Sequence, residues 1–350
     1  MSTKTRHIYR WDLDKTYLRT DFETMRGLIR AALQTPEEKV NVPGVVTLLK
    51  ELSLPDEDGG VYVTFISGSP TQMREKLERK FAIDGIHPDV FILKPTLKNL
   101  LKGRFRAVRG QVGYKLDSLL RVREEGPQAP ETLFGDDVEQ DAFIYSLYAD
   151  LAAGRVDRDL LFEILDDAGV YSRTRASILN RFSRMRQSDD VGRIFINLDH
   201  HTAPGRFWVY GPRVVPITNY FQAALVLFSD GVLRVTPVLR VAAGMIADHG
   251  YGVTQLANSF QDLIRRRHLG REAIDRLEDR IQQFQASPDT LQVNLPPDFF
   301  DRLLARVRAL APRQTAPAVD WDGPPDYLGV LEANRKLRDQ VEPEPGLFRK

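Results

Sequence analysis

The sequence contains no cysteine, which excludes disulfide bonds, thiolate zinc sites and cysteine nucleophiles. No apolar run approaches the ~20 residues of a membrane-spanning helix, and the first residues form no hydrophobic signal segment. Neither sign of charge is in excess, because 49 basic side chains stand against 48 acidic ones, so general attraction to nucleic acid is not indicated. We expect a soluble, cytoplasmic protein whose metal ligands are oxygen atoms.

Short apolar runs alternate with amphipathic stretches up to about residue 150. This alternation is typical of β-α-β units around a mainly parallel sheet. The predicted fold class is therefore α/β, with a parallel sheet flanked by helices. The predicted strands cover residues 7–13, 61–66, 90–93, 132–134 and 191–198.

Helical periodicity dominates the second half of the chain. We predict a sheet domain over residues 1–235, which contains a helical insertion at about residues 155–189. A helical C-terminal region of three or four helices follows over residues 236–311. Residues 312–350 are rich in proline and charge, and we predict a disordered tail there because this composition buries little apolar surface.

The first predicted strand runs into Asp12-Leu13-Asp14-Lys15-Thr16. Both carboxylates then lie at the carboxyl edge of the sheet, where α/β proteins bind ligands. At a period of two, Asp12 and Asp14 point the same way, and such a pair repels unless a cation or a shared proton lies between them. The pair predicts a bound metal ion.

The second predicted strand ends in Ser67-Gly68-Ser69-Pro70, which places a hydroxyl and backbone N–H groups at the same edge. These groups suit phosphate oxygens. Lys115 is expected to open the helix before the fourth strand, where its ammonium can neutralise phosphate charge and keep nearby carboxylates ionised. Together these segments predict an anion pocket.

The fourth predicted strand runs into Gly135-Asp136-Asp137-Val138-Glu139-Gln140-Asp141. Asp136 stands at the sheet edge, and hard carboxylate oxygens there suit magnesium. Each of the four motifs alone is common in ordinary turns. Because all four occur in order at strand ends or helix starts, and their chemistry fits one reaction, we interpret them as one active site.

This order of motifs resembles the haloacid dehalogenase superfamily over about residues 7–150. The resemblance implies a magnesium-dependent phosphatase that hydrolyses a phosphate monoester through an aspartyl-phosphate intermediate. It implies Asp12 as the nucleophile and Asp14 as the general acid and base, with Ser67 and Lys115 as phosphate binders.

The predicted site residues fall into three groups. The metal ligands are Asp12, Asp14 and Asp136; the substrate-binding residues are Ser67, Gly68 and Lys115; the supporting residues are Thr16, Asp137 and Asp141. The Asp199-His200-His201 segment after the fifth strand either contacts substrate or is an ordinary surface loop, and the sequence leaves both interpretations open.

Within the superfamily, these segments look similar to the actin-patch-associated phosphatidate phosphatases and, more distantly, the lipins. The short intervals between motifs leave no room for a large cap domain, which favours an open site and a lipid or macromolecular phosphate as substrate. The alternatives are a phosphatase of small metabolites or nucleic-acid ends, and a catalytically silent scaffold with a helical interaction module.

Overall fold

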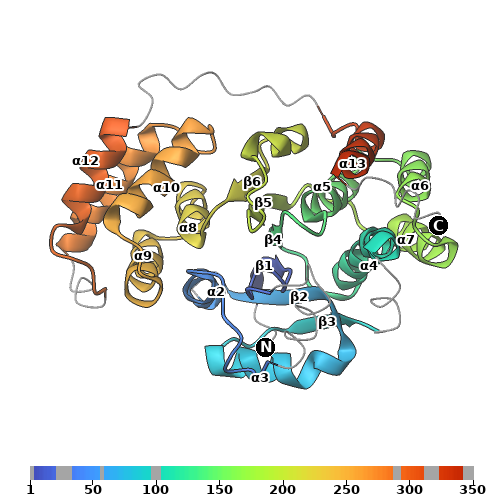
Figure 1. The fold of residues 1–350 in the computed structure, drawn as a ribbon, viewed down its shortest axis with the longest axis horizontal. Helices are drawn as coiled ribbons and strands as arrows, with labels where there is room; N and C mark the ends of the chain where they lie inside the picture. The colour runs from blue at the N-terminus through green and yellow to red at the C-terminus, as the bar shows by residue number, and fades with distance from the viewer. Residues whose placement is uncertain are drawn as a thin grey trace, which may run out of the picture.

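A six-stranded, wholly parallel sheet forms the centre of the molecule (Figure 1). The computed structural model describes residues 4–20, 34–55, 59–95, 104–286, 293–310 and 323–341. The strands are β1 (Thr5–Trp11), β2 (Gly60–Pro70), β3 (Val90–Lys94), β4 (Glu131–Asp136), β5 (Val191–Asn197) and β6 (Val214–Ile217). Their order is β3-β2-β1-β4-β5-β6. β2 and β3 therefore lie on one side of β1 and β4 to β6 on the other, so the strand order reverses between β1 and β4. Ligands of open α/β sheets bind at such a switch point.

The α/β fold class is confirmed, and the five predicted strands are present to within a few residues. The sixth strand, β6, was not predicted. β1 is a strand although it contains Arg10. The guanidinium is buried there because the Glu131 carboxylate of β4 accepts two hydrogen bonds from it.

Alternate residues of the strands contribute to two hydrophobic clusters on opposite faces of the sheet. In β4, for example, Phe134 belongs to one cluster and Leu133 to the other. The first face carries α2 (Val45–Ser53), α3 (Arg74–Asp84) and α8 (Tyr220–Ser229). The second carries α4 (Arg104–Glu125), α5 (Asp141–Ala152), α6 (Arg158–Asp167) and α7 (Ser172–Arg184).

Four further helices extend the first face, and they confirm that the C-terminal region is helical. They are α9 (Val235–His249), α10 (Val253–Arg265), α11 (Glu272–Gln285) and α12 (Phe299–Leu310). Their apolar stripes belong to the same hydrophobic cluster as α2 and α8, so this region packs directly on the sheet domain (Figure 1). No helix among the described residues is long and apolar enough to cross a membrane.

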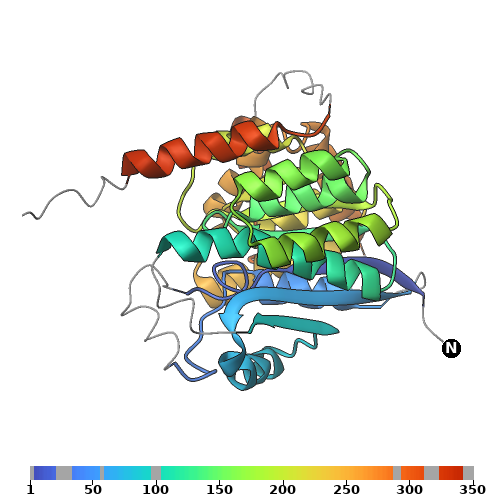
Figure 2. The same ribbon diagram turned by 90° about the vertical axis from the view of Figure 1, so that its right-hand side faces the viewer.

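The prediction of a disordered tail is wrong for Tyr327–Val341, which forms α13. This helix lies along α6 at the edge of the second face (Figure 2). The Tyr327 hydroxyl donates a hydrogen bond to the buried Asp150 carboxylate of α5, and Arg335 pairs with Asp167 at 2.5 Å. Contacts to residues far away in the sequence order this segment, and local composition does not reveal them.

The predicted position of Lys115 at the start of a helix is also wrong, because α4 begins at Arg104 and places Lys115 in its middle. Gly113 lies inside α4, and the segment that joins α6 to α7 packs against this glycine. A Cβ atom at Gly113 would lie 2.8 Å from Val170 Cγ1, so the glycine allows close approach of the segment between α6 and α7. Lys115 therefore lies well inside α4, away from its N-terminus.

Candidate active site

The residues after β1 turn sharply at the carboxyl edge of the sheet. The Asp12 amide donates to the Phe134 carbonyl at 2.8 Å, which fixes the turn against β4. Lys15 has a left-handed backbone (φ 62°), and its carbonyl accepts a hydrogen bond of 2.7 Å from the Asn197 side chain. Tyr220 donates to the Thr16 carbonyl at 2.7 Å. Neighbouring strands and α8 thus hold this turn in one conformation.

Asp136 ends β4 beside this turn and begins a tight loop. Its Oδ1 accepts the backbone N–H groups of Val138 at 2.5 Å and Glu139 at 3.0 Å. The loop closes through a left-handed backbone at Gln140 (φ 64°), after which α5 begins. Gly135 is required here, because a Cβ atom would lie 2.5 Å from the Asp141 side chain.

Lys115 joins the two turns. Its Nζ lies 2.8 Å from Asp12 Oδ1, 3.0 Å from Glu139 Oε2 and 2.5 Å from Asp141 Oδ1. The side chains of Lys115, Asp12 and Asp141 are buried. The structure therefore brings predicted residues from three separate motifs into contact, although Lys115 comes from mid-helix.

Asp12, Asp136 and Glu139 each offer an oxygen atom within 4.8 Å of the others, a geometry that can hold a metal ion. Asp12 Oδ2 and Asp136 Oδ2 are buried and accept no hydrogen bond from any described residue. An unpartnered buried carboxylate oxygen is costly unless a cation approaches it. The all-oxygen set suits a hard divalent cation such as Mg²⁺.

The electrostatics of the cluster favour the same interpretation. Burial raises the pKa of Asp12 well above its usual value, although Lys115 opposes this effect. Burial, with Asp141 and Glu139 nearby, also raises the pKa of Asp136. Burial disfavours the Lys115 ammonium, but the surrounding carboxylates raise its pKa well above normal. The Lys115 ammonium thus supplies one positive charge to a cluster of four carboxylates. A divalent cation would offset the remaining negative charge of the cluster.

Asp14 takes a different position from the one predicted. It is not in the carboxylate group that can hold a metal. Its Oδ2 instead accepts hydrogen bonds from Ser69 Oγ at 2.7 Å and Ser67 Oγ at 3.2 Å. Burial and the nearby Glu139 charge raise the pKa of Asp14 to about 6. A carboxyl group of this kind can exchange a proton near neutral pH, and its metal role stays a prediction.

The Ser67 segment lies against this carboxylate at the end of β2. Ser67 Oγ also accepts a hydrogen bond from the Ser69 amide at 2.9 Å, and Tyr114 donates to the Ser67 carbonyl at 2.9 Å. A Cβ atom at Gly68 would lie 3.1 Å from the Gln111 amide nitrogen, so the glycine keeps the backbone close to α4. Their phosphate-binding roles remain predictions.

The loop after β5 contacts both the turn after β1 and the loop after β4. Asp137 accepts hydrogen bonds from the backbone amides of His200 and Thr202, both at 3.0 Å. Lys15 Nζ lies 2.9 Å from His200 Nε2 and 3.7 Å from Asp199 Oδ2. His201 has a left-handed backbone (φ 55°). Asp199 and His200 therefore adjoin the site, and Asp137 positions their loop.

Two residues of the site were not singled out from the sequence. Glu139 was noted only as one acid of its cluster, and no periodicity shows that it turns inward. Ser69 was seen as part of a turn, although its spacing of two from Ser67 places both hydroxyls on one side. Residues 21–33 and 96–103 lie outside the described residues, so the expectation of an open site stays a prediction.

Comparison with known proteins supports the motif-based interpretation. Residues 11–159 match the family model described as "Phosphatidate phosphatase APP1, catalytic domain". No curated protein and no solved structure matches the chain. The matched segment includes the turn after β1, the Ser67 segment, Lys115 and the whole 135–141 loop. Residues 11–159, somewhat less than half of the chain, thus match the catalytic domain of a phosphoric monoester hydrolase.

Proposed function

We propose that this protein is a Mg²⁺-dependent phosphatase that cleaves a phosphate monoester through an aspartyl-phosphate on Asp12. The observation that carries the proposal is the position of Lys115, whose ammonium contacts Asp12, Glu139 and Asp141 at 2.5–3.0 Å. It can neutralise the negative charge that otherwise keeps a carboxylate away from a phosphate ester.

Asp12, Asp136 and Glu139 would hold the cation, which would supply Lewis-acid stabilisation of the transferring phosphoryl group. In the first step, an Asp12 oxygen bonds to phosphorus as the ester bond to the leaving oxygen breaks. Asp14 donates its proton to that leaving oxygen. In the second step, water attacks phosphorus while Asp14 takes its proton, so phosphate departs and both carboxyl groups return to their starting states.

Ser67, Gly68 and Lys115 would bind the phosphoryl oxygens in both steps. The Ser67 and Ser69 hydroxyls hold the Asp14 carboxylate, which orients it beside the phosphoryl site. Thr16 is buried and would support the turn that carries both aspartates, as Asp137 and Asp141 would support the facing loop.

We further propose phosphatidate, or another lipid or macromolecular phosphate, as the substrate class. The matched family supports this choice, since its printed name is that of a phosphatidate phosphatase. The rival assignments are a phosphatase of small metabolites or nucleic-acid ends and a catalytically silent scaffold. Retention of every motif residue argues against the scaffold. We also propose residues 1–235 as the catalytic unit.

Substrate profiling tests this function. Phosphate release should be measured from phosphatidate in mixed micelles, from a phosphopeptide, and from glycerol 3-phosphate, each with Mg²⁺ and with a chelator. We expect turnover of phosphatidate that the chelator abolishes. Turnover of glycerol 3-phosphate alone would favour the metabolite phosphatase, and no turnover of any ester would favour the scaffold.

A further inference from the structure

A cavity of about 350 Å³ lies beside the loop of residues 136–141, which we call the catalytic loop. Asp136 and Asp141 form part of its lining, and these two carboxylates also belong to the cluster around Lys115. The remaining walls come from α5, from η3 (Pro204–Tyr210) and from α13. The cavity therefore adjoins the reaction centre, but two of its walls lie outside the segment that matches the catalytic family.

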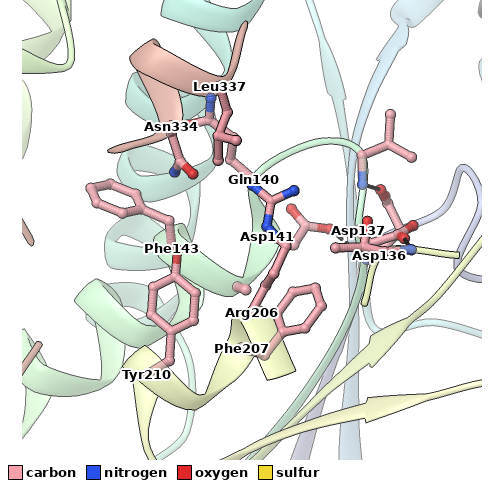
Figure 3. A pocket seen from close by; sticks show the side chains of 13 residues that line it. Asp136, Asp137, Gln140, Asp141, Phe143, Arg206, Phe207, Tyr210, Asn334 and Leu337 are labelled. Carbon is pink, nitrogen blue, oxygen red and sulfur yellow. Dashed lines mark hydrogen bonds between the residues drawn. The ribbon is translucent and has the colours of Figure 1, made fainter. Parts of the chain in front are cut away.

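The cavity is polar where the 136–141 loop lines it and carries apolar side chains on its other walls. Phe143 of α5 and Phe207 and Tyr210 of η3 present aromatic rings, and Leu337 of α13 covers them from the other side (Figure 3). Leu337 is 39% exposed, so an apolar group in the cavity would remove its side chain from water. These walls suit the apolar part of a ligand, such as a hydrocarbon chain.

One cation lies among the groups that line the cavity. Figure 3 shows the Arg206 side chain extending from η3 toward the 136–141 loop. No carboxylate of a described residue forms an ion pair with it, and its guanidinium can donate hydrogen bonds to an oxygen-rich group. The polar end of a ligand would then face the catalytic loop, and its apolar end would face the aromatic wall.

The position of α13 over this cavity is fixed by specific contacts. Asn334 forms a side-chain hydrogen bond with Tyr210, which links α13 to η3 directly. At the start of the helix, Tyr327 is hydrogen-bonded to the buried Asp150. A wall held at its start and at its middle provides a preformed binding surface, which lowers the entropic cost of binding.

We propose that this cavity binds the apolar chain of the phosphate ester, with Arg206 donating to acceptor oxygens at the polar end of the ester. The inference rests on the proposed phosphatase function and gives its leaving group a location. The helix α13 and η3 then select substrates by the length of the hydrocarbon chain next to the phosphate.

The test compares two soluble esters, ethyl phosphate and octyl phosphate, below the micellar concentration of the longer one. In the wild-type protein, kcat/KM should rise by up to about fourfold for each added methylene until the cavity is full. Leu337→Glu should lower kcat/KM for octyl phosphate at least tenfold and leave ethyl phosphate within twofold. Arg206→Gln should lower kcat/KM for both esters by a similar factor.

Two variants serve as matched controls. Ala333→Glu places the same charge at an exposed position of α13 that does not line the cavity, and Trp208→Ala alters an exposed residue of η3. Both should retain the wild-type dependence on chain length. Circular dichroism melting curves would show that Leu337→Glu and Ala333→Glu fold alike.

A second readout separates this inference from the phosphatase function. Binding of ethylphosphonate and octylphosphonate can be measured by calorimetry without turnover. Hydrolysis of both esters with no dependence on chain length would overturn the cavity assignment and leave the phosphatase function standing. Octylphosphonate binding that Leu337→Glu weakens, in a protein that hydrolyses nothing, would support the cavity and overturn the phosphatase function.

Discussion

Arg10 and Glu131 join β1 to β4 directly below the site, through hydrogen bonds of 2.5 Å from Nε and 2.8 Å from Nη2. Glu131 also accepts hydrogen bonds from Arg123 at 2.8 Å and from the Tyr148 hydroxyl. All four side chains are buried, and the Glu131 carboxylate contacts both guanidinium groups, of which Arg123 also pairs with Asp190 at 2.9 Å. The strands that carry Asp12 and Asp136 are thereby held together by charge as well as by backbone pairing.

Glu131→Gln should therefore destabilise the fold. The substitution leaves the buried Arg10 without a countercharge, whereas Arg123 keeps its ion pair with Asp190. Breaking a buried ion pair in this way costs about 3–5 kcal/mol. Chemical denaturation would measure the free energy of unfolding. Glu332→Gln, which removes an exposed pair with Lys336 on α13, is the matched control and should leave that free energy nearly unchanged. Equal effects of both substitutions would contradict this role of Glu131.

Asp12→Asn should abolish turnover and prevent formation of the phosphoenzyme, because an amide oxygen is a poor nucleophile. Asp14→Asn should behave differently. It removes the proton donor and acceptor but leaves Asp12 intact, so slow phosphorylation by an ester with a good leaving group should still occur. Mass spectrometry of protein trapped with beryllium fluoride would locate the adduct. An adduct on Ser67 or His200 would rule out Asp12 as the nucleophile.

Glu139→Gln and Asp136→Asn should each raise the Mg²⁺ concentration needed for half-maximal activity, by about tenfold or more. The reason is that each removes one of the three carboxylates that can hold a metal. Titration of activity with Mg²⁺ after chelator treatment provides the measurement. Glu163→Gln on the exposed face of α6 is the control. Full activity of the wild-type protein in excess chelator would contradict the proposed dependence on Mg²⁺.

Lys115→Met should lower kcat by about a hundredfold or more, since one cation at a transferring phosphoryl group contributes several kcal/mol to transition-state stabilisation. The side chain keeps a similar volume, so the packing of α4 is preserved. Lys50→Met, at an exposed position near the end of α2, should have no effect. A variant with a normal melting temperature and a near-wild-type rate would remove Lys115 from the mechanism.

The stability of the protein should fall on mild acidification because of His268. Burial and the nearby Arg266 and Arg193 lower the pKa of His268 to about 3 in the folded state. In the unfolded chain this imidazole takes up a proton below about pH 6.5. Its contribution to folding is therefore complete above pH 6.5 and declines toward pH 3, by at most about 1.4 kcal/mol per pH unit.

His268→Gln should flatten this decline. Melting temperatures of wild-type and variant proteins between pH 7.5 and pH 4.5 provide the comparison. The two curves should converge as the pH falls, because only the wild-type protein loses this contribution. Parallel curves would show that another group dominates the acid response.

The sequence alone located the candidate site because most of its residues lie at strand ends. Asp12 and Asp136 each directly follow or end a strand, and parallel strands bring such residues to one edge. Lys115 was assigned to the site for its charge, but its place in α4 was missed because Gly110 and Gly113 suggest a helix boundary. Only the packing of Val170 against Gly113 explains why the helix continues.

The unpredicted parts depend on contacts between residues that are distant in the sequence. Glu139 turns inward because Gln140 adopts a left-handed backbone and Lys115 pairs with its carboxylate. α13 is ordered because Tyr327 reaches Asp150, 177 residues away along the chain. Neither relationship leaves a periodic pattern in the local sequence.

Because of the position of α13, the proposed residues for ester cleavage and those for ester selection lie in different parts of the sequence. The residues that we propose for bond cleavage all lie within residues 11–159, whereas α13 and η3 come from the segment beyond it. Substitutions in the first part should decide whether an ester is cleaved, and substitutions in the second should decide which ester is accepted. Proteins with identical catalytic motifs can therefore differ in the esters that they accept while their chemistry stays the same.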